Sequence, residues 1–336
     1  MGQHGRTARM VEQLQEALGP GPWRRADVLA TGWTPGQVRR AVEAGRLTRP
    51  YRDVLALPIA TAPPGARGRG LWLSTCATAR LHIATGRAAL SHESAAEWQG
   101  LWVPQRSDDL LHLTVDGGRD RRERDVRIHA SALPERMVTT VRGLRVTTPA
   151  RTAVDVARGR PLPDALVALD SACRRVRGAE PTAWYLRTPE GREAARATSL
   201  PGLVDALDAQ RRWPGSAVVR TALDHVDPAS ESAFESWSRG WMVLDDLPRP
   251  QLGLRVVGES GQVRWSDFAW EEARVLGEAD GFGKFGTDES SVREALVRER
   301  HRQRDLEDAG WTVVRWDPRE SPRLWLARLR RELKRT

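Results

Sequence analysis

The chain has 336 residues, of which 40% are hydrophobic and 29% charged, and its mean hydropathy is −0.52. This composition predicts a globular protein of two or three domains, each with its own core. No apolar run reaches the roughly 18 residues of a membrane helix, and the start lacks the apolar segment of a secretory signal. Two cysteines are too few for a disulfide framework, so we expect a cytoplasmic protein. The net charge of +9 favours a polyanionic partner.

The first 45 residues show the pattern of three short helices. Thr7 can cap the first helix, and the second covers 24–30. Thr34-Pro35 combines a capping residue with a proline at the first turn, which predicts the start of a third helix over 37–43.

A strand–turn–strand pattern follows over 47–58, in the segment LTRPYRDVLALP. Three helices followed by such a hairpin predict a winged helix-turn-helix, which we place at 1–60. In that fold the third helix enters the major groove of DNA and the wing meets phosphates. The expected DNA contacts are Gln37, Arg39 and Arg40 on the helix, and Arg46, Arg49 and Arg52 on the wing.

A Pro/Gly-rich linker at 61–70 leads into a mixed α/β region that we place at 71–215. Its apolar patterns predict two strands, at 111–115 and 126–130, joined by a charged loop. They also predict helices at 71–86, 91–98, 149–156, 163–175 and 201–211.

Residues 216–336 form a third predicted domain. A helix capped by Ser230 or Ser232 precedes three strands, a long charged helix over about 288–309, the strand TVVRW and a last helix over 321–334. The order αβββαβα completes a multidomain α+β protein.

Three acids lie in the central strands of this domain. Asp267 ends one strand, while Glu278 and Asp280 lie on the next strand and face the same side. Their neighbours are apolar or aromatic, and burying carboxylates there is costly unless a cation or hydrogen bonds meet them. Converging carboxylates are the ligands that Mg²⁺ or Mn²⁺ needs to orient a water for phosphodiester cleavage.

The pieces SAFESWSR, RWSDFAW, GEADGFGKF and RERHRQRDLEDAGWTVVRW resemble the very-short-patch-repair-like branch of the PD-(D/E)XK nucleases, over roughly 230–318. The resemblance implies that Asp267, Glu278 and Asp280 bind the metal and that Glu235 is a helix-borne catalytic acid. Asp280 stands where the family has its lysine. The resemblance therefore assigns the lysine's role to Lys284, four residues further on.

The front of the chain resembles the winged helix of AbiEi-type antitoxins from type IV toxin–antitoxin systems. The pieces LSHESAA and TTPARTAVDVAR are similar to multidomain bacterial proteins that join such a domain to a nuclease-like end.

Several patterns also have structural interpretations. The acids could form ion pairs with Arg264 and Arg274, and Glu235 could pair with Arg239 one turn later. Ser91-His92-Glu93 predicts a helix cap followed by an ordinary histidine, and the scattered histidines show no zinc spacing. GFGKFG lacks the helix of a dinucleotide-binding unit, so we expect no nucleotide cofactor.

Together these patterns predict a DNA-targeted, Mg²⁺-dependent endonuclease that does not bind membranes. The alternative is a non-catalytic AbiEi-type antitoxin or transcriptional regulator with a degenerate nuclease fold, which could also bind a toxin.

Overall fold

A computed structural model describes most of the chain. The described residues are 3–19, 22–51, 53–58, 87–104, 108, 110–123, 126–141, 144–175, 183–210, 213–281 and 300–335. They form two compact units, one of Met1–Gly100 with Arg106–Thr152 and the other of Leu101–Gln105 with Ala153–Thr336. Helices and mixed sheets occur in both units, which confirms the predicted multidomain α+β class. In the described part of the chain, no helix combines the length and the apolar character needed to cross a bilayer.

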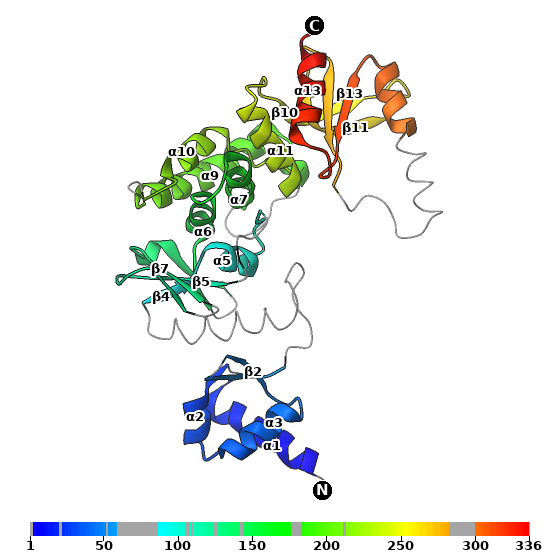
Figure 1. Cartoon of the computed structure of the whole chain (residues 1–336). Helices are drawn as coiled ribbons and strands as arrows, with labels where there is room; N and C mark the ends of the chain where they lie inside the picture. The colour runs from blue at the N-terminus through cyan, green and yellow to red at the C-terminus, as the bar shows by residue number, and fades with distance from the viewer. Residues whose placement is uncertain are drawn as a thin grey trace. The chain divides into compact units, whose positions relative to one another are not determined.

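The N-terminal helices and a small sheet form the winged helix, drawn in blue in Figure 1. Its elements are α1 (Gln3–Leu18), β1 (Trp23–Arg24), α2 (Arg25–Ala30), α3 (Pro35–Glu43), β2 (Thr48–Tyr51) and β3 (Val54–Ala56). The strand order β1-β3-β2 places the wing hairpin beside β1. Leu14, Val28, Ala41 and Leu55 are fully buried in its core. The prediction for α1 was wrong at its start, because the helix begins at Gln3, four residues before Thr7.

The other described strands of the first unit form a six-stranded mixed sheet. Its strands are β4 (Ala88–Leu90), β5 (Leu111–Val115), β6 (Arg121–Glu123), β7 (Val126–Ala130), β8 (Val138–Val141) and β9 (Leu144–Thr147), in the order β6-β7-β5-β4-β9-β8. Helix α5 (His92–Gln99) follows β4, and η1 (Glu135–Met137) precedes β8. Ala95 and Trp98 of α5 join the apolar cluster of the strands. The predicted strands at 111–115 and 126–130 are confirmed, whereas β6 occupies part of the predicted loop.

The second unit starts inside α6 (Pro149–Ala157) and continues with four further helices. They are α7 (Leu162–Arg174), α8 (Ala183–Leu186), α9 (Pro189–Asp208) and α10 (Ser216–His225). All but one of the residues of α7 are buried, so this helix is the centre of the helical part of the unit. The predicted helix at 71–86 lies outside the described residues.

The C-terminal sheet has the order β10-β11-β12-β13. Its elements are α11 (Ala233–Leu244), β10 (Gln251–Val257), β11 (Val263–Trp270), β12 (Val275–Ala279), β13 (Thr312–Trp316) and α13 (Pro322–Leu333). The first three strands are antiparallel, and β13 joins β12 in parallel. One face packs against α11 and α13 through Phe268 and Trp325, and the other packs against the helical residues 300–308 through Leu306. The predicted order of elements is therefore present where the chain is described.

Helix α11 also packs tightly against α7. A Cβ atom on Gly240 would lie 2.3 Å from the Cα of Pro163, a distance that no real side chain occupies. The buried guanidinium of Arg239 contacts the carboxylate of Asp170 on α7. The helices that precede the C-terminal sheet, from residue 153 onward, therefore form one compact unit with it.

Candidate functional site

A capping box fixes the start of α3. The Thr34 hydroxyl accepts a hydrogen bond from the Gln37 backbone at 3.3 Å, and Gln37 Oε1 accepts one from the Thr34 backbone at 2.7 Å. Gln37 Nε2 lies 3.9 Å from the sulfur of Met10. The Gln37 side chain therefore caps the start of α3 and contacts α1. Its predicted contact with DNA stays a prediction.

The two faces of α3 differ in their exposure to solvent. Val38 and Ala41 are buried in the winged-helix core, whereas Arg39 and Arg40 are exposed. Arg39 lies 3.8 Å from Glu43, and the two side chains are 75% and 65% exposed. Water therefore screens this ion pair, and the Arg39 guanidinium stays accessible to other groups.

Arg46 and Arg49 extend this basic surface toward the wing. Both are exposed, Arg46 just after α3 and Arg49 on β2. Glu43 is the only acid in residues 35–51, which contain four arginines. The segment therefore presents a local excess of positive charge, as a DNA phosphate backbone requires. Arg52, the other predicted wing contact, lies outside the described residues.

The C-terminal acids Glu235, Asp267, Glu278 and Asp280 are called the acidic centre here. Ser232 caps α11 and accepts a hydrogen bond from the Glu235 backbone at 3.1 Å. The Glu235 carboxyl in turn accepts bonds from the Ser232 hydroxyl at 2.8 Å and from the Glu231 backbone at 2.7 Å. Burial raises the pKa of Glu235 to about 8, and the negative charge of Asp267 adds to this. Glu235 is therefore mostly protonated at neutral pH.

Asp267 and Glu278 lie on the neighbouring strands β11 and β12, with different partners. Asp267 Oδ2 accepts a hydrogen bond from the Ala279 backbone at 2.8 Å. Glu278 is 1% exposed, and both of its oxygens lie 3.3 Å from an Arg302 nitrogen. A further nitrogen, from Arg315, lies 3.8 Å from Glu278. Two guanidinium groups thus compensate the buried charge of Glu278.

Asp280 pairs with Arg315 as well, at 3.6 Å. The partners that the sequence suggested are engaged elsewhere: Arg264 lies 3.8 Å from Asp305, and Arg274 lies over the Trp311 ring. Ion pairing is therefore present, but with different arginines.

No three carboxylates of the described residues approach one another closely enough to share a metal ion. In this arrangement Arg302 and Arg315 lie beside Glu278, and Arg315 also lies beside Asp280. Lys284 lies outside the described residues. The catalytic and Mg²⁺-binding roles of the acidic centre stay a prediction.

A cluster of three histidines was missed by the sequence analysis. His92, His112 and His129 each offer a ring nitrogen, and these atoms all lie within 4.8 Å of one another. Ser91 is the N-cap residue of α5, as predicted, but its hydroxyl contacts His92 Nδ1 at 3.0 Å and makes no capping bond to the helix backbone. Burial lowers the pKa of His129 to about 4, so this ring is neutral at physiological pH. The three residues come from separate elements of the fold. The only signal available in the sequence was therefore the alternation of side chains within β5 and β7, the strands that carry His112 and His129.

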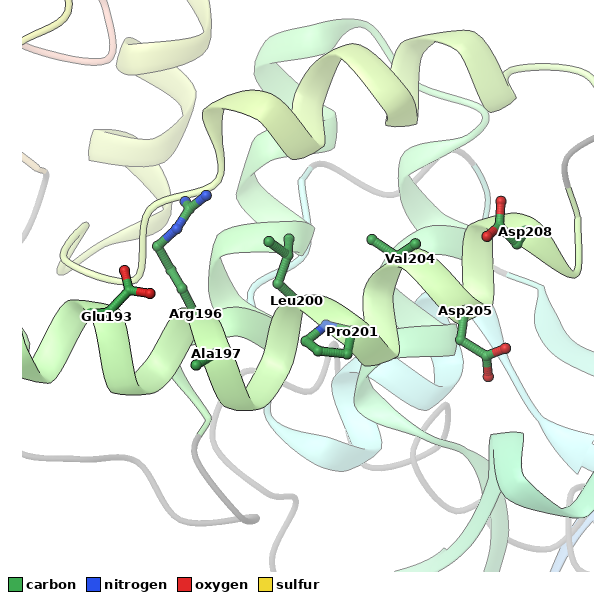
Figure 2. A pocket seen from close by; sticks show the side chains of 8 residues that line it. All are labelled: Glu193, Arg196, Ala197, Leu200, Pro201, Val204, Asp205 and Asp208. Atoms are coloured by element: carbon green, nitrogen blue, oxygen red, sulfur yellow. The ribbon is translucent and has the colours of Figure 1, made fainter.

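An open groove of about 670 Å³ lies along α9 and is called the α9 groove here. Figure 2 shows its lining, which consists of Glu193, Arg196, Ala197, Leu200, Pro201, Val204, Asp205 and Asp208. Val204 is 41% exposed in this groove. Three acids and one arginine line an apolar centre, so the groove is unsuited to the phosphates of DNA.

Two comparisons identify relatives of the chain. It is 31% identical over 198 residues to an uncharacterized protein of Mycobacterium tuberculosis, found in strain CDC 1551 / Oshkosh and in strain ATCC 25618 / H37Rv. The match covers 58% of this chain and 64% of the relative, which is less than two thirds of the relative's length. Residues 24–206 match the family described as AbiEi antitoxin C-terminal domain. Because this match covers more than half of the chain, the protein belongs to the AbiEi antitoxin C-terminal domain family.

Proposed function

We propose that this protein is a DNA-binding antitoxin and transcriptional regulator that uses its winged helix to bind DNA. The observation that carries the proposal is the arrangement of α3. Its apolar face is buried in the core, and Arg39 and Arg40 project from the opposite face. Membership of an antitoxin family supports the regulatory role.

Two kinds of contact follow from this arrangement. Arg39 and Arg40 lie on the helix that enters the major groove, where arginine reads guanine through two hydrogen bonds. Arg46 and Arg49 lie toward the wing, where they meet phosphates and position the protein without reading sequence. The helix therefore supplies specificity, and the wing supplies affinity that depends on salt.

The test is equilibrium binding of the full chain to DNA from upstream of its own gene and to an unrelated duplex of equal length. We expect the wild type to prefer the upstream DNA and to leave a footprint on it. Arg39→Ala and Arg40→Ala should each weaken that preference by about 1–3 kcal/mol. Arg220→Ala is the matched control, since Arg220 is exposed on α10. Equal affinity for both duplexes in all four proteins would overturn the proposal.

A toxin is the protein partner that the family membership supports, and the α9 groove is a suitable surface for it. Leu200 and Val204 provide an apolar centre, and the acids around them fit a basic protein surface. Val204→Glu should abolish binding of a toxin encoded beside this gene, as measured by titration calorimetry. Leu244→Glu should leave that binding unchanged, because Leu244 is exposed at the end of α11, outside the groove lining. If Val204→Glu binds as the wild type does, the toxin contacts a different surface.

A Mg²⁺- or Mn²⁺-dependent endonuclease is the second candidate. It is favoured by the strand order of the C-terminal sheet and by the closeness of Glu235 to Asp267. Supercoiled plasmid incubated with the protein and Mn²⁺ provides the test. Nicking by the wild type that is lost in Asp267→Asn and kept in Arg220→Ala would support this candidate. Intact plasmid together with a specific footprint would leave the regulator as the function.

A further inference from the structure

The histidine cluster gathers side chains from three separate elements of the first unit. His112 lies on β5, His129 on the parallel neighbour β7, and His92 at the first position of α5. His129 pairs in register with Thr114, two residues after His112, so both histidines project from the same face of the sheet. His112 Nδ1 and His129 Nε2 lie 2.9 Å apart.

The backbone at His92 is strained in a way that brings its ring into this cluster. Its φ of +50° lies in the left-handed region, which residues other than glycine rarely adopt. The ring nevertheless stacks on His129 with a centroid distance of 3.7 Å, and it is 7% exposed. Such strain persists only where the surrounding structure enforces it, and it concentrates at functional sites.

Polar groups lie beside two of the three rings. Asp108 accepts from His112 Nε2 at 2.9 Å, so the lone pair of this ring is on Nδ1, which lies 2.9 Å from His129 Nε2. The Ser91 hydroxyl lies 3.0 Å from His92 Nδ1. A carboxylate on the outer nitrogen of a ring is the usual support of a metal-bound histidine, because it fixes the tautomer and makes the ligand more basic.

A carboxylate lies beside one of the three rings. Glu93 is buried, and its Oε2 is 3.7 Å from His112 Nδ1, the nitrogen that faces His129. Three imidazoles form a donor set that zinc accepts in tetrahedral geometry, with one position left for a further ligand. Nitrogens bound to one such ion stand about 3.3 Å apart, given metal–nitrogen bonds of roughly 2.0–2.1 Å. The cluster's separations are compatible with this spacing.

We propose that His92, His112 and His129 bind one divalent transition-metal ion of the zinc class. Three nitrogens favour zinc, cobalt or nickel over magnesium or calcium, which prefer oxygen. Binding requires the stacked rings of His92 and His129 to rotate until both lone pairs meet the ion. The ion then ties the start of α5 to β5 and β7, so it stabilises the sheet of the first unit.

The experiment uses the full chain after treatment with a chelator and gel filtration. Zn²⁺ and Co²⁺ are added separately, unbound ion is removed, and metal per chain is measured by elemental analysis. We expect one ion per chain, a visible absorption band of tetrahedral Co²⁺, and a higher Tm with Zn²⁺. His112→Gln and His129→Gln should lose all three signals, as should His92→Asn, whose asparagine tolerates the left-handed backbone.

Two further variants keep the test decisive if a histidine variant fails to fold. Asp108→Asn removes only the outer support of His112 and should weaken Zn²⁺ binding about 10–100-fold. His225→Gln, which changes a histidine of α10, should bind one ion as the wild type does. A wild type that retains no ion, or an Asp108→Asn variant with unchanged affinity, would overturn the proposal.

Discussion

Arg239 and Asp170 form a buried ion pair that connects α11 to α7. Asp170 is fully buried, and its carboxylate also accepts a hydrogen bond from the Asp227 backbone at 2.9 Å. Arg239 also donates to the carbonyl oxygen of His225. The helix that precedes the C-terminal sheet is therefore held by the helical part of the second unit through a pair of charges that water cannot reach.

Removing one charge of this pair should destabilise the second unit strongly. Arg239→Met leaves the Asp170 carboxylate buried without its cation, which costs about 3–5 kcal/mol. The double variant Arg239→Met/Asp170→Asn should lose less than the sum of the two single variants, because no charge is then left unpaired. Urea unfolding of the full chain measures both effects. Arg220→Met, at an exposed position, is the control. A loss of unfolding free energy for Arg239→Met no larger than for this control would contradict the predicted role of the ion pair.

The contact between Gly240 and Pro163 predicts a second effect. A methyl group at Gly240 has no room, so Gly240→Ala should push α11 from α7 and cost about 1–3 kcal/mol. Gly36→Ala is the matched control. There the new Cβ would meet only the end of the Arg40 side chain at 3.6 Å, and helix propensity favours alanine by up to about 1 kcal/mol. Unfolding free energies that change in the same direction for both variants would contradict this account of the helix contact.

The acidic centre predicts a dependence of stability on pH. The pKa of Glu235 is raised from 4.5 to about 8, so between these values the folded chain keeps a proton that the unfolded chain has lost. The stability that this carboxyl contributes is complete below pH 4.5 and is lost as the pH rises through about 8.

Glu235→Gln removes this dependence because glutamine is neutral throughout. Relative to the variant, the wild type should lose stability with rising pH, by at most about 1.4 kcal/mol per pH unit. Unfolding of both proteins across the interval from pH 4.5 to about 8 measures the difference. A difference that stays constant with pH would show that Glu235 is already ionised in the folded protein.

The capping box of α3 predicts a stability effect in the winged helix. Thr34→Ala removes the side-chain oxygen that accepts from the Gln37 backbone and should cost about 0.5–2 kcal/mol. Thr34→Ser keeps a hydroxyl and should lie close to the wild type. Hydrogen exchange of the α3 amides measures the opening of this helix without interference from the second unit. Equal protection in the two variants would mean that the cap contributes little.

Much of the local structure was predictable from the sequence. Thr34-Pro35 marked the start of α3, and apolar alternation marked β5 and β7, because these signals lie within a few residues of the element. The order of the C-terminal elements was predictable for the same reason. The winged-helix arginines could be placed on an exposed surface because helix periodicity separates them from Val38 and Ala41.

The contacts between distant residues were not predictable. Glu278 meets Arg315 because β13 joins β12 in parallel, with these two residues in register, and no local pattern reveals that pairing. The histidine cluster needs β5 and β7 to be neighbours. It also needs the chain to turn sharply at His92. Residue spacing in a single sequence therefore predicts metal-binding side chains that are close along the chain. It does not predict those that come together only when the strands pair in the sheet.

The salt dependence of DNA binding tests the central claim most directly. We propose measuring the affinity of the full chain for its upstream DNA over a range of salt concentrations, for the wild type, Arg46→Ala, Arg49→Ala and Arg220→Ala. Each phosphate contact contributes about one unit to the slope of log affinity against log salt concentration. Arg46→Ala and Arg49→Ala should each lower that slope by about one, while Arg220→Ala leaves it unchanged. Identical slopes in all four proteins would contradict DNA binding through the winged helix.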